Sequence, residues 1–166
     1  MRTVILASAL LATSATAADN GPKAIFAKHW QISRDFTLAV ARAMPAEGYS
    51  FKPNPEEMSF GELMIHLADE NLQDFSRAAK TKPLPKPSSS DRQTAIQFLM
   101  DSFDKCARDF DSIPPEQLDQ VLYQHKGSPV IGWEALWFAF THTAHTRAQA
   151  EVYLRVKGIK PPDYDF

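Results

Sequence analysis

The stretch that most constrains the fold of this chain runs from Gly132 to Gly158 and reads GWEALWFAFTHTAHTRAQAEVYLRVKG. Alternating steps of four and three residues, which keep side chains on one face of a helix, connect a set of mostly apolar positions. That face comprises Ile131, Ala135, Phe138, His142, His145, Gln149, Val152 and Val156. It is apolar at both ends and polar in the middle. We predict a long helix that buries this face, together with two imidazoles and one amide.

The polar groups in the middle of this helix need partners, because an unpaired buried group costs about 1–3 kcal/mol. Two arrangements would provide them. In the first, His142 and His145 form a hydrogen-bonded polar layer with Gln149 and Glu70. In the second, the two histidines, which are three residues apart and therefore close on the helix, bind one metal ion. The spacing alone leaves both arrangements open.

A third histidine, His66, lies on a second predicted helix, beside its apolar arc. Glu70 follows one turn later on the same flank. Metal sites in helical bundles are built from side chains on facing helices. His66, His142 and His145 would together supply three nitrogen ligands of the kind that zinc prefers.

Three further segments have the spacing of amphipathic helices, namely residues 22–44, 59–80 and 90–113. Ser59–Glu62 and Ser90–Gln93 have the pattern of a capping box, in which a side-chain hydroxyl and a side-chain carbonyl each satisfy a free backbone N–H. Prolines follow the first and third of these segments and end the helices there. With the long helix described first, the chain contains four predicted helices.

The connections between these helices contain no convincing strand. Residues 81–87 read as a stiff, polyproline-like connector. Residues 118–131 read as irregular, with a short turn of helix around 117–123. The sequence therefore predicts an all-α fold, a four-helix bundle over residues 20–160, followed by a surface tail of residues 161–166.

The N-terminal residues have the organisation of a secretory signal peptide. Arg2 precedes the apolar run VILASALLA, which is too short to span a membrane, and a small-residue cleavage pattern follows at Ala15–Ala17. We assign residues 1–18 to a signal peptide, in preference to a buried N-terminal helix, and expect a periplasmic or secreted protein. No later run has the length of a transmembrane helix.

The charge and cysteine content narrow the range of partners. With 18 basic and 20 acidic side chains and a net charge of −2, the chain has no general attraction for nucleic acid or anionic lipid. We therefore expect neither a nucleic-acid nor a membrane partner. Cys106 is the one cysteine, so no intramolecular disulfide forms, and its apolar neighbours predict a buried thiol.

Two stretches of the chain resemble the DinB-like (DNA-damage-inducible) family of four-helix bundles. The first is SFGELMIHLAD, residues 59–69. The second runs from His142 to Ile159 and ends YLRVKGI, with Pro161–Pro162 behind it. The resemblance implies an up-down-down-up bundle that is often a dimer. Some members are thiol-dependent transferases or isomerases, but the export signal argues against a cytosolic thiol cosubstrate.

The resemblance also implies a set of metal ligands, one histidine from the second helix and two, spaced i and i+4, from the last helix. His66 and His142 match the first two positions, while the third falls on Thr146, a poor metal ligand. His145, one residue earlier, is the local substitute, although a helix turns by about 100° per residue. We therefore assign His66, His142 and His145 as ligands of a divalent cation, zinc or nickel.

Three functions remain open. A metal-dependent transferase or hydrolase would act on a small-molecule substrate, with Glu70 or Asp69 as general base and Gln149 orienting a ligand. A non-catalytic protein of the cell envelope would bind the ion for stability or sequestration. A metal-free helical module would instead bind a partner through the exposed parts of Trp133 and Trp137.

Overall fold

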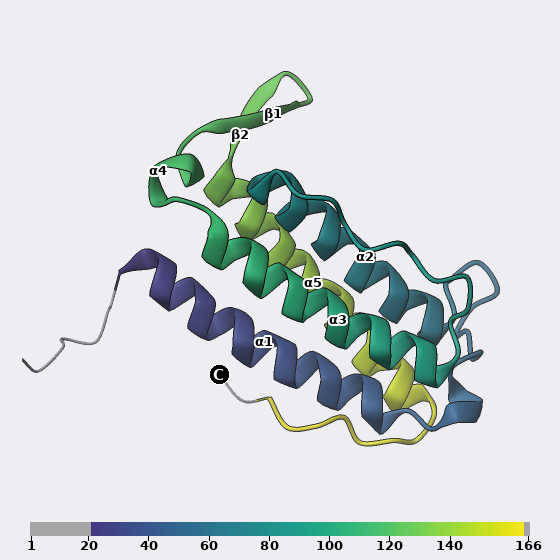
Figure 1. Cartoon of the computed structure of the whole chain (residues 1–166). Coiled ribbons are helices and arrows are strands. Elements are labelled where there is room, and N and C mark those ends of the chain that lie inside the picture. The colour runs from purple at the N-terminus through teal and green to yellow at the C-terminus, as the bar shows by residue number, and fades with distance from the viewer. Residues whose placement is uncertain (1–20, 165–166) are drawn as a thin grey trace, which may run out of the picture.

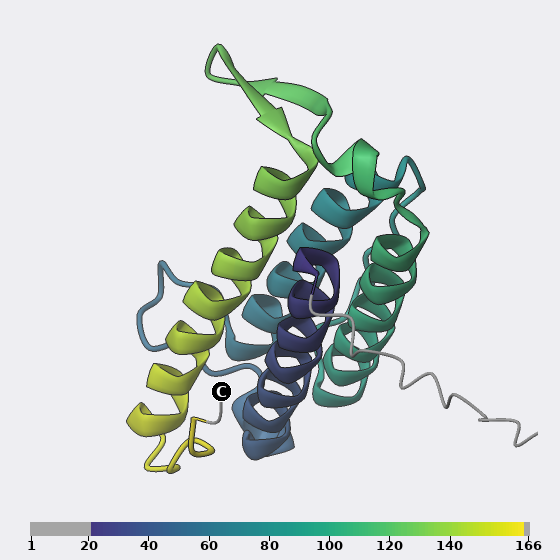
Figure 2. The same ribbon diagram turned by 90° about the vertical axis from the view of Figure 1, so that its left-hand side faces the viewer.

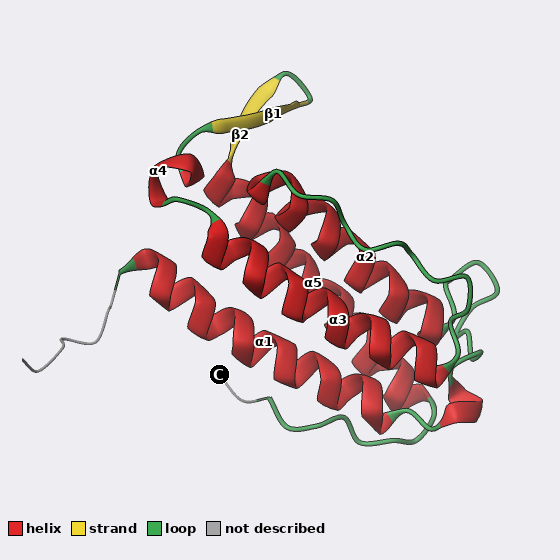
Figure 3. Ribbon diagram, in the orientation of Figure 1, coloured by secondary structure: helices red, strands yellow, loops and turns green. Residues whose placement is uncertain are grey.

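The computed structural model describes residues 21–164, and the predicted signal peptide, residues 1–18, lies outside them. Most of the described residues are helical (Figures 1 and 3). In chain order the elements are α1 (Pro22–Ala43), the short 3-10 helix η1 (Ala46–Gly48), α2 (Phe60–Ala79), α3 (Arg92–Ser112), α4 (Pro115–Leu118), β1 (Val121–His125), β2 (Ser128–Ile131) and α5 (Gly132–Val156). The helices predicted over 22–44, 59–80, 90–113 and 132–158 are therefore present, each with its ends within two residues of the prediction.

The four long helices pack side by side (Figures 1 and 2). Helix α2 packs against α3 and α5, and α1 packs against the same two helices from the other side. Between α2 and α3, residues 80–91 run back along the outside of the helices, so that α2 and α3 begin at the same end of the molecule (Figure 1). None of the helices within residues 21–164 is long and apolar enough to cross a membrane.

The core between α1, α2 and α3 is rich in aromatic rings. Trp30 of α1 lies 4.5 Å from Phe75 of α2 and 5.0 Å from Phe103 of α3, measured between ring centroids. Such tilted pairs contribute about 0.5–1.5 kcal/mol beyond the burial of their area. The predicted burial of Cys106 is confirmed, and this burial raises the pKa of its thiol. A thiol held protonated in the core is a packing group rather than a nucleophile.

The capping box that opens α2 is confirmed. The Glu62 N–H donates to Ser59 Oγ at 3.2 Å, and the Ser59 N–H donates to Glu62 Oε2 at 2.7 Å. Gly61 lies inside the box, and a Cβ at this position would collide with the Ser90 carbonyl oxygen, so the start of α2 and the end of the connector meet at a glycine. The second predicted box is wrong, because Asp91 caps α3 and accepts from the Thr94 N–H at 3.1 Å.

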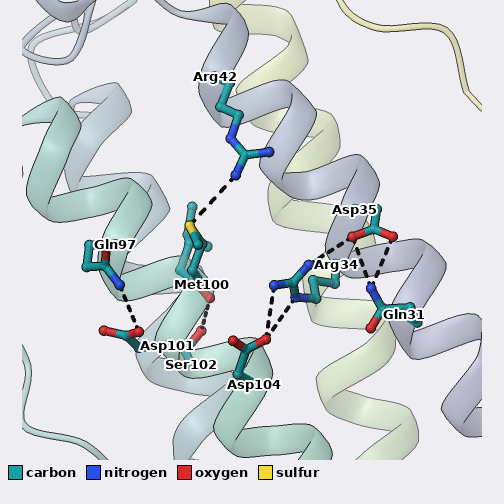
Figure 4. Close-up of polar contacts among 10 residues, drawn as sticks. Gln31, Arg34, Asp35, Arg42, Gln97, Met100, Asp101, Ser102 and Asp104 are labelled. Carbon is teal, nitrogen blue, oxygen red and sulfur yellow. Dashed lines mark hydrogen bonds and ion pairs between the residues drawn. The ribbon is translucent and has the colours of Figure 1, made fainter.

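On the outer surface, α1 and α3 are joined by an ion pair. Arg34 reaches from α1 to Asp104 on α3, with its Nη2 3.0 Å from Asp104 Oδ1 (Figure 4). Arg34 also pairs with Asp35 of its own helix at 3.0 Å. Exposed pairs of this kind contribute about 0–1 kcal/mol, so the aromatic core rather than this contact holds α1 in place.

The face of α5 that packs against the molecule is not the face predicted from the sequence. Among the predicted members, Phe138, Val152 and Val156 are 57%, 52% and 59% exposed, and His145 and Gln149 are exposed as well. The buried residues are Gly132, Ala135, Leu136, Ala139, Thr143, Thr146, Arg147, Ala150, Tyr153 and Leu154. Seven of these ten residues also follow steps of four and three, but their series begins one residue later, at Gly132. Because one residue turns a helix by about 100°, this shift exposes five of the eight residues of the predicted face.

The segment predicted to be irregular, residues 118–131, contains an antiparallel hairpin of β1 and β2. The turn residues Lys126 and Gly127 both have positive φ, 49° and 85°, as two-residue hairpin turns of the primed type require. The expected helical turn around 117–123 is also displaced, to Pro115–Leu118. The hairpin projects beyond the ends of the long helices and leads directly into α5 (Figures 1 and 2).

Candidate functional site

Two of the three predicted metal ligands meet between α2 and α5. The imidazole rings of His66 and His142 lie 5.1 Å apart between centroids, with their planes at 83°. Both side chains are half-buried. Each comes from the middle of a long helix, so the packing of α2 on α5 fixes the distance between them.

His145 does not join this pair. It lies on the exposed side of α5, where its Nε2 is 3.2 Å from the side-chain amide nitrogen of Gln149. The physical reason is the one-residue shift of the buried face. Within residues 21–164, no group of three or more histidine, cysteine, aspartate or glutamate side chains is placed to hold a metal ion. The alternative of a buried polar layer that includes His145 and Gln149 is wrong for the same reason, since both are exposed.

Thr146 takes the place that His145 was expected to fill. It is buried, and its Oγ1 lies 3.3 Å from His142 Nε2. This is the position on which the resemblance places the third histidine of the family. The chain therefore presents a hydroxyl to the pair where a third imidazole was expected.

The electrostatics of His142 favour the neutral ring. Burial lowers the pKa of His142 and the neighbouring His66 lowers it further, while Glu70 acts in the opposite direction. The Nδ1 atom of His142 is buried and has no hydrogen-bond partner in the part of the chain that the structure describes. A neutral imidazole with an unpaired nitrogen is the form in which histidine binds metals.

The two predicted general bases differ in their surroundings. Asp69 is engaged, because its Oδ2 lies 3.2 Å from the Nζ of Lys86 on the connector. Glu70 is half-buried and its side chain makes no hydrogen bond or ion pair to the other residues of 21–164, although it influences the pKa of His142. Glu70 is therefore the unpaired carboxylate near the histidine pair, although the three do not form a metal-binding group in the described residues.

Phe138 borders the pair on α5. Its ring is nearly parallel to that of His142, at 14°, with 6.3 Å between centroids. It was predicted to be buried, but its 57% exposure makes it an apolar edge of the site that faces solvent. A cavity of about 500 Å³ adjoins His66, and another of about 590 Å³ adjoins Glu70 and Phe138.

Three buried polar residues on α2 and α5 were not singled out from the sequence. Asn71 accepts a hydrogen bond from the Thr143 hydroxyl at 3.0 Å, and this contact joins the two helices directly after the paired histidine of α5 and five residues after that of α2. Arg147 is 7% exposed and donates from Nη1 to Ser33 Oγ at 3.1 Å. Thr143 and Arg147 are both buried on α5, and the same spacing begun one residue later would have found Thr143 but not Arg147, which follows directly after Thr146.

Comparisons with known proteins agree with this architecture. A DinB-like protein from Bacillus subtilis has 21% identity and a TM-score of 0.72, over 84% of this chain and 96% of that one. A DinB-like protein from Bacillus cereus has 18% identity and a TM-score of 0.70, over 84% and 95%. A conserved protein from Enterococcus faecalis has 19% identity and a TM-score of 0.61, over 80% and 94%. These likenesses concern the fold.

Among curated proteins, none is significantly similar to this chain in sequence. The sequence profile of the DinB family, in contrast, matches residues 16–166, which is nearly the whole chain. With the same fold in DinB-like proteins of two bacilli, this match shows that the chain belongs to the DinB family.

Proposed function

We propose that this chain is an exported four-helix-bundle protein that binds a divalent cation, zinc or nickel, between α2 and α5. The observation that carries the proposal is the pair of imidazoles, 5.1 Å apart and supplied by facing helices. The lowered pKa of His142 favours its neutral ring, and Nε2, the nitrogen beside Thr146, is then able to bind a cation.

The residues present fit a cation site in part. His66 and His142 supply two nitrogen ligands, and the nearby Glu70 does not complete a group of three with them among the described residues. Thr146 contributes a hydroxyl, which is not among the groups that zinc prefers. A bound divalent cation would supply a Lewis acid and a water molecule of lowered pKa. Because the third imidazole is missing, we propose cation binding, rather than hydrolysis or group transfer, as the activity.

Titration calorimetry of the untagged protein with zinc and with nickel tests this proposal. We expect His66→Ala and His142→Ala each to weaken binding by at least about tenfold, because each removes one of two imidazole ligands. His145→Ala is a matched control on the same helix, and we expect its affinity to stay within about twofold of the parent.

Elemental analysis of the purified, untagged protein gives an independent measure of the bound metal. Undiminished zinc binding by His142→Ala would contradict a site at the pair. Loss of binding in His145→Ala would show instead that the exposed histidine is a ligand.

A further inference from the structure

A cavity of about 590 Å³ lies where the hairpin meets α2 and α5. We call it the hairpin cavity. Its walls include Glu70 and Asp74 of α2, Tyr123 and Val130 of the hairpin, and Glu134 and Phe138 of α5. Sites for small molecules typically have volumes of about 300–1,000 Å³ and combine apolar walls with a few polar groups. The hairpin cavity has this size and this composition.

The hairpin wall of the cavity is held by a cation–π contact. The guanidinium of Arg77 on α2 lies over the ring of Tyr123 on β1, 4.6 Å from its centroid. Arg77 Nη1 also lies 3.1 Å from Asp74 Oδ1. The one arginine of the cavity is therefore already engaged by a carboxylate and a ring, and it keeps the hairpin against α2.

The carboxylates of the cavity outnumber this arginine. Glu70 has no ion pair in the described residues, and Glu134 accepts only the Ile131 N–H, at 2.9 Å. Neither has a cationic partner there. The cavity therefore has an excess of negative charge, which favours a cation over an anion.

Asp74 is a further carboxylate on the wall of the cavity. It is 6% exposed and its Oδ1 pairs with Arg77, while Oδ2, which is open to solvent, makes no hydrogen bond to any described residue. Burial raises the pKa of Asp74 to about 6, Arg77 opposes this, and the neighbouring Glu70 adds to it. A buried carboxylate that lines a cavity with one unpaired oxygen is placed to accept hydrogen bonds from an ammonium group.

The opposite wall is apolar. Phe138 is 57% exposed although it borders the cavity, and Val130 and Tyr123 are half-buried beside it. Exposed aromatic surface of this kind binds the apolar part of a ligand, and an aromatic face also attracts cations.

We propose that the hairpin cavity binds a small organic amine, with its ammonium group at Glu70 and Asp74 and its apolar part against Phe138. Glu70 and Asp74 are one turn apart on α2 and so present their side chains to the same region. Phe138 also stacks on His142, so a ligand in this cavity would lie next to the histidine pair. The binding does not require a cation at that pair.

Calorimetry with 2-phenylethylamine and its neutral counterpart 2-phenylethanol tests the proposal, in the presence of EDTA. We expect the amine to bind at least about tenfold more tightly than the alcohol, because only the amine pairs with the carboxylates. Glu70→Gln and Phe138→Ala should each weaken amine binding by at least about fivefold. Glu116→Gln, an exposed carboxylate on α4 outside the cavity, is the matched control and should leave the affinity unchanged.

Phe138 is exposed, so its replacement should not disturb the fold, and thermal unfolding checks this for each variant. Equal affinity for the amine and the alcohol would overturn the proposal, and so would unchanged amine binding in both variants. The absence of binding at about 10 mM amine would also overturn it. EDTA removes divalent ions, so these outcomes are separate from those of the zinc and nickel titrations.

Discussion

Helices α2 and α5 face each other across the histidine pair, but they bury different kinds of side chain. Helix α2 buries large residues such as Leu67, Leu72 and Phe75 and exposes polar ones such as Gln73 and Arg77. Helix α5 buries many small residues and exposes large ones. Its exposed large apolar residues are Trp137, Phe138, Val152 and Val156.

The distance between packed helices depends on the size of the side chains at their contact. The buried alanines and threonines of α5 therefore allow its neighbours to approach closely. In α2, hydrophobicity identifies the packed face. In α5, which is apolar on more than one side, the small size of the residues identifies it instead.

The largest expected effect comes from a charge placed on the true face of α5. Ala150 is fully buried, whereas Val152, which belongs to the face predicted from the sequence, is 52% exposed. We expect Ala150→Lys to destabilise the protein by more than about 3 kcal/mol, because it buries an unpaired charge. We expect Val152→Lys to change the stability by less than about 1 kcal/mol. Urea unfolding followed by circular dichroism measures both values.

The two lysine variants carry the same new charge, two residues apart on one helix. If Val152→Lys were as destabilising as Ala150→Lys, the difference between α2 and α5 would not hold. The predicted face would then be the packed one.

The parts of the fold that sequence could predict are those fixed by local signals. The helix ends follow from prolines and from the capping residues Ser59 and Glu62, whose hydrogen bonds form within one turn. The face of α2 follows because its polar residues define the opposite side. The position of His66 beside His142 follows from the resemblance, which supplies information about a distant contact.

The remaining features depend on tertiary contacts or on unusual local chemistry. The face of α5 could not be chosen by hydrophobic spacing, and His145 was misplaced with it. The hairpin was missed because Lys126 takes a φ of 49°, a conformation for which asparagine or glycine is the usual signal. Without the hairpin, no argument from sequence could place Asp74 and Tyr123 at one cavity.

An effect of intermediate size concerns Asp74, the buried carboxylate of α2. Its pKa is raised from 3.8 to about 6 in the folded protein, chiefly by burial. As the pH rises from about 4 to about 7, the Asp74 carboxyl loses its proton at a lower pH in the unfolded chain than in the folded protein. The free energy of unfolding therefore falls over this pH range. We expect Asp74→Asn to remove this loss, which is on the order of 1–3 kcal/mol.

Urea unfolding of the parent and Asp74→Asn at pH 4 and pH 7 measures this effect, because other titrating groups cancel in the comparison. The stability of the variant relative to the parent should rise between the two pH values. An unchanged difference would show that the pKa of Asp74 is the same in the folded and the unfolded protein, as expected for an exposed residue.

The smallest effect that we predict, about 1.4 kcal/mol or tenfold in affinity, concerns position 146 of α5. Thr146 Oγ1 lies 3.3 Å from His142 Nε2, whereas His145 is turned to the exposed side. Thr146→His should therefore tighten zinc binding, since it adds an imidazole where the chain now has a hydroxyl.

Thr146→Cys adds a smaller zinc ligand at the same buried place and tests the same point if histidine is too large. His145→Ala in the Thr146→His background should leave the gain intact. If neither Thr146→His nor Thr146→Cys tightens zinc binding in a folded protein, then the side chain at position 146 does not reach the proposed cation site. The one-residue shift of the buried face of α5 would then not be enough to explain why α5, unlike α2, lacks a metal ligand at the predicted place.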